Sequence, residues 1–249
     1  MERLNRFLAR SGVASRRAAD ELIASGSVRV NGEVAPPSGI LVDPEKDEVT
    51  VDGRAVKRLT RHRYLMLNKP LGVITTAKDE GSRTTVLDAV GDEGLAGHRL
   101  FPVGRLDADT TGLLVLTDDG DLAFRLTHPR YKVAKEYVAV VAGSPSQKDI
   151  EALRSGVDLD DGKTAPAEVE VVGFDGAPGA GRTEVRVVIR EGRQRQVRRM
   201  LQAVGHRTQS LRRTGFGPLK LGRLKVGGWR VLGEGEIEAL HRAVRIEPR

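Results

Sequence analysis

Residues 104–117 read GRLDADTTGLLVLT, and this stretch is the most informative part of the sequence for the fold. The apolar run at residues 113–116 is bounded by turn-forming residues, which predicts a buried β-strand. The polar segment before it is then a loop held by a rigid element, where catalytic groups tend to be placed. Asp107 is one of the two aspartates of this loop. An isolated aspartate at such a position more often only caps a turn.

The composition restricts the class of protein. The chain has 249 residues and no cysteine, which excludes disulfides, thiolate zinc sites and cysteine nucleophiles. No apolar run is long enough to span a membrane, and residues 1–6 lack the apolar core of a signal peptide. We therefore expect a cytoplasmic protein without a membrane partner. Neither a cofactor motif nor metal-ligand spacing is found, so we expect no cofactor and no metal.

The charge is positive and unevenly distributed. The formal net charge is +7, from 41 Lys and Arg against 34 Asp and Glu. Between residues 190 and 230 there are twelve Lys or Arg and a single acid, Glu191. Such a field attracts polyanions, and it favours nucleic acid as the partner. A solvated basic face would give the same composition, so charge alone leaves both interpretations open.

The N-terminal segment has the pattern of a small, separate module. Leu4, Phe7 and Leu8 recur at helical spacing, and Ser15 is placed to cap a second helix. Residues 27–34 alternate like a strand pair around an Asn-Gly turn. Two short helices followed by a small basic sheet resemble the S4 RNA-binding domain, for which we expect residues 1–58. Its candidate RNA contacts are Arg3, Arg6, Arg16 and Arg17.

Residues 59–249 are expected to form a second, larger domain. Strands are predicted at residues 64–67, 73–76, 135–141 and 185–189. A helix is predicted over residues 193–204, with Val197, Met200, Leu201 and Val204 on its buried face. On a helical wheel of this segment, Arg195, Arg198 and Arg199 lie on the side opposite the buried face.

Four segments of this domain together resemble the motifs of the RNA pseudouridine synthases. They are NKPLG at 68–72, GRLD at 104–107, KEY at 135–137 and RQVRRM at 195–200. The resemblance implies an α+β fold with a mixed, largely antiparallel sheet and flanking helices behind the small S4 domain. It implies an enzyme that isomerises uridine to pseudouridine in RNA without a cofactor.

The resemblance also assigns roles to individual residues. Asp107 is the indispensable carboxylate, Tyr137 packs against the target uracil, and Arg105 supports the position that the extruded base leaves. Arg198 is expected to hold the Asp107 carboxylate bidentately, because a buried carboxylate needs a cationic partner. Whether Asp107 attacks C1′ or removes a proton from C2′ stays open. Further candidate RNA contacts are Arg193, Arg195 and Arg199.

An S4 domain joined to these motifs resembles the ribosomal RsuA/RluB-type branch. Arg195 before Gln196 is similar to large-subunit members, whereas the small-subunit enzyme has histidine at that place. The expected partner is therefore 23S rRNA or a pre-ribosomal particle, acted on by a monomer. Two alternatives stay open, namely a 16S rRNA pseudouridine synthase and a noncatalytic rRNA-binding assembly factor. The modified uridine is not specified by the sequence.

Overall fold

The computed structural model describes residues 1–59, 61–77, 79, 81–175 and 181–245. The chain divides into two compact units. Met1–Arg63 with Asp118–Gly120 form one unit, and Tyr64–Thr117 with Asp121–Arg249 form the other. Within the described residues, no helix is both long and apolar enough to cross a membrane.

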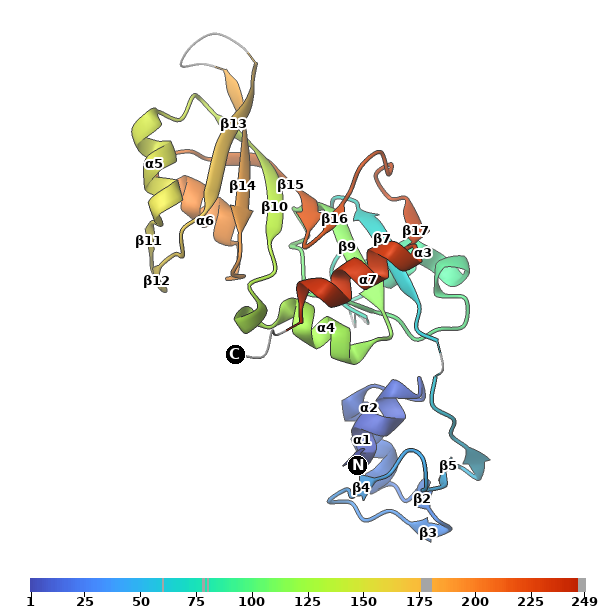
Figure 1. Cartoon of the computed structure of the whole chain (residues 1–249). Coiled ribbons are helices and arrows are strands. Elements are labelled where there is room, and N and C mark those ends of the chain that lie inside the picture. Colours follow the sequence, from blue (N-terminus) through green and yellow to red (C-terminus); the bar gives the residue numbers. More distant parts are fainter. Residues whose placement is uncertain (60, 78, 80, 176–180, 246–249) are drawn as a thin grey trace. The chain divides into compact units, whose positions relative to one another are not determined.

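The N-terminal unit consists of two helices and short strands (Figure 1). The elements are β1 (Glu2–Arg3), α1 (Leu4–Arg10), α2 (Arg16–Ala24), β2 (Val28–Val30), β3 (Glu33–Val34), β4 (Leu41–Val42), β5 (Val49–Val51) and β6 (Arg54–Ala55). The main sheet has the order β3-β2-β5-β6, and β1 pairs with β4. The Ser15 hydroxyl accepts a hydrogen bond from the Ala18 amide (3.1 Å), which confirms the predicted cap of α2. Asn31 and Gly32 both have positive φ, as the predicted tight hairpin requires.

The arginines predicted to contact RNA lie on the outside of this unit. Arg3, Arg6, Arg16 and Arg17 are exposed, whereas Leu4 and Leu8 are fully buried. The helical spacing of the apolar residues thus separates a small core from a basic surface.

The larger unit is built on one nine-stranded sheet (Figure 1). Its strands are β7 (Tyr64–Lys69), β8 (Phe101–Pro102), β9 (Thr111–Thr117), β10 (Lys135–Ala142), β13 (Glu168–Asp175), β14 (Arg182–Ile189), β15 (Thr208–Phe216), β16 (Leu219–Lys220) and β17 (Trp229–Val231). The main path runs β13-β14-β10-β15-β9-β7-β17, with β16 on β15 and β8 on β9. Within the described strands of this sheet, only the β15–β9 pairing is parallel. Two antiparallel halves therefore meet at that contact.

Helices cover both faces of this sheet. They are α3 (Val86–Leu95), α4 (Gly120–Thr127), α5 (Gln147–Ser155), α6 (Gln196–Ala203) and α7 (Glu234–Ala243). Buried residues of α3, α5 and α6 belong to one core cluster, and those of α4 and α7 belong to a second. Strand β7 contributes Leu65 and Leu67 to the first cluster and Met66 to the second. This alternation explains why β7 is apolar on both faces.

Two predicted elements differ from the structure. The strand predicted at residues 73–76 is reduced to a single bridge between Ile74 and Thr85. Its Thr75 hydroxyl instead bonds to the backbone of Leu106, so this segment supports a loop and does not extend the sheet. The helix predicted over 193–204 begins only at Gln196, because Arg195 adopts a left-handed conformation (φ 50°).

Gly112 is the residue that allows the two halves of the sheet to join. It pairs with Arg213 across the parallel contact and has a φ of +106°. A Cβ atom at this position would lie 2.2 Å from the Arg213 carbonyl oxygen and 2.7 Å from its amide nitrogen. Both obstacles are backbone atoms, so a side chain here would force the strands apart.

Gly112→Ala is therefore expected to lower the free energy of unfolding by about 2–3 kcal/mol, from backbone strain and overpacking together. Trp229, the one tryptophan of the chain, lies in β17 and reports the larger unit by fluorescence during urea unfolding. The matched control is Gly97→Ala, where φ is also positive but, apart from the adjacent residues, no described residue has an atom within 4 Å of the added Cβ. Equal destabilisation by the two variants would contradict the close-approach argument.

Candidate active site

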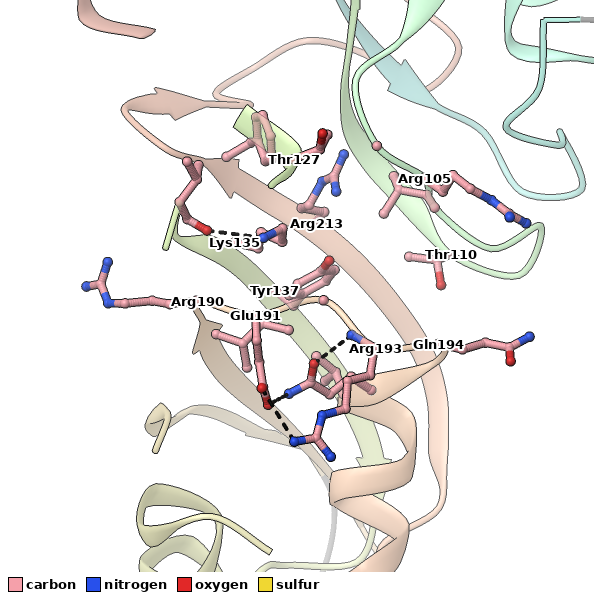
Figure 2. A pocket seen from close by; sticks show the side chains of 18 of the residues that line it. Arg105, Thr110, Thr127, Lys135, Tyr137, Arg190, Glu191, Arg193, Gln194 and Arg213 are labelled. Carbon is pink, nitrogen blue, oxygen red and sulfur yellow. Dashed lines mark hydrogen bonds and ion pairs between the residues drawn. The ribbon is translucent and has the colours of Figure 1, made fainter. Parts of the chain in front are cut away.

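A cavity of about 610 Å³ lies in the larger unit, where β10, β15, the loop before β9 and the segment before α6 meet (Figure 2). Five of the predicted site residues line it, and they come from three separate parts of the chain. These are Arg105, Asp107, Tyr137, Arg193 and Arg195. Arg198 and Arg199 are not among its lining residues.

The loop that carries Asp107 is fixed by hydrogen bonds to the turn after β7. The Thr75 hydroxyl donates to the Leu106 carbonyl (2.6 Å) and accepts from the Leu106 amide (3.2 Å). The Gly72 amide donates to the Ala108 carbonyl (2.8 Å). These bonds hold the backbone on both sides of Asp107, whose carboxylate remains 37% exposed. Gly72 of the NKPLG motif and Thr75 just after it therefore support the loop that bears the carboxylate.

Lys69 is a buried cation at the start of that turn, and it was not among the predicted site residues. It ends β7, is fully buried, and its Nζ donates to the carbonyls of Val73 (2.6 Å) and Pro70 (3.1 Å). Burial lowers the pKa of Lys69 to about 8, against the opposing attraction of Asp107 and Asp109. Its position at the end of a strand that begins with four apolar or aromatic residues is the sequence feature that could have indicated it.

Tyr137 lies on β10, with its ring in the wall of the cavity (Figure 2). It is 8% exposed, and Ala139 and Val141 on the same face are fully buried, which confirms the alternation predicted for this strand. Across the sheet, Tyr137 pairs with Arg213 of β15. The strand thus presents an aromatic face to the same space as the Asp107 loop.

The guanidinium beside Asp107 belongs to Arg195, which corrects the expected pairing with Arg198. Nη1 of Arg195 lies 4.0 Å from Oδ2 of Asp107. No ion pair within that distance joins Arg198 to Asp107, both of which are described residues. Arg198 instead donates from Nη2 to the carbonyl oxygen of Asp109 (2.7 Å), and its Nε lies 3.4 Å from the Asp109 carboxylate.

Asp109 links both arginines to the loop that carries Asp107. Arg195 donates to its two carboxylate oxygens (3.1 and 2.8 Å). These hydrogen bonds hold the pKa of Asp109 below its usual value, although burial acts in the opposite direction. Arg198 is mostly buried and Arg195 is half exposed. The arrangement differs from the prediction because Arg195 precedes the helix, so a helical wheel does not describe where its side chain points.

The other predicted arginines fall into two groups. Arg193 and Arg199 are bound to the β11–β12 hairpin (Asp158–Leu159 and Gly162–Lys163). Arg193 donates to the Lys163 carbonyl (2.6 Å), and both arginines pair with Asp161. Arg105 is exposed and has no ion-pair partner among the described residues. Within the same residues, no three histidine or carboxylate side chains are grouped as a metal site requires.

Comparison with known proteins defines the class to which this fold and site belong. Residues 63–203 match the RNA pseudouridylate synthase family, and residues 2–44 match the S4 domain. The chain therefore belongs to the RNA pseudouridylate synthase family and carries an N-terminal S4 domain. The family and the α+β fold expected from the motifs are confirmed.

Individual relatives match along nearly the whole chain. A protein of Aquifex aeolicus described as an uncharacterized RNA pseudouridine synthase is 44% identical over 98% of this chain and 96% of its own length. The ribosomal large subunit pseudouridine synthase B of Bacillus subtilis is 42% identical over 96% of each chain. A crystal structure of a pseudouridylate synthase is 32% identical, with a TM-score of 0.66, and the match covers 96% of this chain and all of the other.

Proposed function

We propose that this protein converts a specific uridine of 23S rRNA to pseudouridine, with Asp107 as the catalytic carboxylate. The observation that carries the proposal is the Asp107 loop, which Gly72 of the NKPLG motif and Thr75 hold at the edge of a cavity that Tyr137 also lines. The Bacillus subtilis relative, named a large-subunit synthase, and Arg195 before Gln196 both favour the large subunit.

The reaction needs little beyond these groups. The N1–C1′ bond of the uridine breaks and a C5–C1′ bond forms, while the C5 proton leaves and N1 gains a proton. The product has the same composition as the substrate, so neither a redox step nor a transferred group is required. Asp107 acts at the ribose in either route, by attack at C1′ or by proton removal at C2′. Tyr137 forms the wall against which the uracil packs.

The target base must leave its stack before it reaches Asp107. Arg105 is exposed at the cavity without an ion-pair partner among the described residues, and it supports the vacated position. We assign residues 1–58 to an S4 domain whose Arg3, Arg6, Arg16 and Arg17 bind backbone phosphates. Those contacts add affinity that falls as salt rises.

The test is to map pseudouridine in the rRNA of cells with and without the gene for this protein, after carbodiimide treatment. We expect the deletion to remove one or very few sites in 23S rRNA, in or beside a loop where extrusion of the base costs least. The wild-type gene should restore the sites, and the purified protein should form them in rRNA from the deletion strain. Loss of a site in 16S rRNA or tRNA would overturn the substrate but not the chemistry. No lost site in any RNA would contradict the whole proposal.

A further inference from the structure

Two cations of the cavity wall are not used by the arrangement around Asp107. Lys135 lies two residues before Tyr137 on β10, so both side chains face the cavity. Arg213 of β15 pairs with Tyr137, and Phe216 pairs with Lys135. A register shift between these pairs places Arg213 and Phe216 on the same side of β15, although they are three positions apart in the chain. Figure 2 shows Lys135 and Arg213 in the part of the cavity nearest Thr127.

Arg213 is a buried cation, and one of its nitrogens has no hydrogen-bond acceptor among the described residues. The residue is 2% exposed, its Nε donates to the Leu113 carbonyl (2.7 Å), and its guanidinium carbon lies 5.0 Å from the centre of the Phe216 ring. These contacts fix the plane of the guanidinium. Its Nη2 is buried and has no hydrogen-bond partner among the described residues. A buried, unpaired donor on a charged group is costly, which indicates that a ligand completes the site.

Lys135 adds a second positive charge to the same wall. Its Nζ donates to the Val133 carbonyl (3.2 Å), which uses one of its three hydrogens. Burial, together with a smaller contribution from the repulsion of Arg213, lowers the pKa of Lys135 to about 8, and Glu191 opposes the shift. The two cations are therefore close enough to disfavour each other when no anion is present.

The acidic residues that line the cavity have partners other than Lys135 and Arg213. Among its lining residues, all of which are described, the acids are Asp107 and Glu191. Glu191 accepts from Gln196 (2.5 Å) and lies 3.6 Å from Arg193, while Asp107 faces Arg195. Neither makes an ion pair with Lys135 or Arg213 within 4.0 Å. This end of the cavity is thus positive, and no described carboxylate forms an ion pair with Lys135 or Arg213 there.

We propose that Lys135 and Arg213 form an anion subsite that binds one backbone phosphate of the RNA adjacent to the target nucleotide. The proposal rests on the proposed function, because it takes RNA as the ligand. Uracil is neutral, and phosphates are the anionic groups of RNA, so two cations in this wall match the backbone and not the base. A guanidinium with a free nitrogen beside a lysine ammonium suits the oxygens of one phosphate.

The first experiment uses inorganic phosphate and does not depend on catalysis. Wild-type protein is acetylated at pH 8 in phosphate or in chloride of equal ionic strength, and modification of Lys135 is measured by peptide mass spectrometry. A lysine with a pKa near 8 is far more reactive at this pH than an ordinary lysine. We expect phosphate to slow acetylation of Lys135 severalfold in wild type and not in Arg213→Gln. The control Arg212→Gln, which removes an exposed arginine from the adjacent position of β15, should keep the protection. Equal labelling in phosphate and chloride would overturn the subsite.

The second experiment asks whether the ligand is RNA. The affinity for rRNA from a deletion strain is measured at several salt concentrations for wild type, Lys135→Gln and Arg212→Gln. Loss of one phosphate contact should reduce the slope of log affinity against log salt by roughly 0.7–0.9. We expect this reduction for Lys135→Gln but not for Arg212→Gln. Lys135→Gln leaves the buried bond from Arg213 to Leu113 in place, so the test survives if Arg213→Gln fails to fold. Unchanged slopes would overturn the RNA assignment. If phosphate protects Lys135 but the protein forms no pseudouridine, the phosphate subsite would stand and the proposed function would be refuted.

Discussion

Asp107→Asn is expected to reduce the single-turnover rate of pseudouridine formation by roughly a thousandfold or more. The amide has nearly the same volume as the carboxylate but carries no charge and is a poor nucleophile and base. The loop should keep its shape, because its backbone is held by hydrogen bonds with the Thr75 hydroxyl and the Gly72 and Thr110 amides, none of which involves the Asp107 side chain. Binding of rRNA should therefore stay near the wild-type value, so the loss appears in the rate and not in the affinity.

The measurement uses rRNA from the deletion strain with enzyme in excess, and carbodiimide mapping at the target site. Asp92→Asn is the matched control, because Asp92 is an exposed aspartate of α3 that does not line the cavity. It removes the same charge and should keep the wild-type rate. If Asp107→Asn retained a rate within tenfold of wild type, Asp107 would not be the catalytic group.

Arg198→Ala is expected to lower the same rate by roughly a hundredfold, because small displacements of a catalytic group cost about that much. Arg198 binds both the carbonyl and the carboxylate of Asp109, two residues beyond Asp107, and it is only 12% exposed. Its removal leaves the Asp109 carbonyl without this donor and loosens the loop. We therefore expect Arg198 to act as a positioning residue through Asp109, and the loss to fall on kcat more than on KM.

Arg195→Ala provides the comparison for this prediction. Arg195 is 45% exposed, and Asp109 would keep its contact with Arg198, so we expect a milder loss of rate. Arg198→Lys should recover part of the rate, since an ammonium can still donate to the Asp109 carbonyl. Equal and mild losses of rate in Arg195→Ala and Arg198→Ala would contradict the positioning role of Arg198. A larger loss in Arg195→Ala would instead make its 4.0 Å approach to Asp107 the important contact.

Local sequence patterns determined most of the elements and the candidate carboxylate. The Ser15 cap, the Asn31-Gly32 turn and the alternation around Tyr137 depend on residues that are close in the chain, and the structure has all three. The apolar run after Gly112 is buried as strand β9, and the polar segment before it is the loop that carries Asp107. Turn chemistry and side-chain periodicity act over a few residues, so a sequence can display them directly.

Only the tertiary structure decided which charged groups meet. The contact between Arg198 and Asp109 spans 89 positions, and it depends on a helix that begins at Gln196. Lys135 and Arg213 come together because a register shift in β15 turns two side chains toward one face. The hydrogen bonds of Lys69 to Pro70 and Val73 depend on a turn that folds back on the end of β7. Such pairings are set by strand register and helix start, where a shift of one residue redirects a side chain, so no local pattern specifies them.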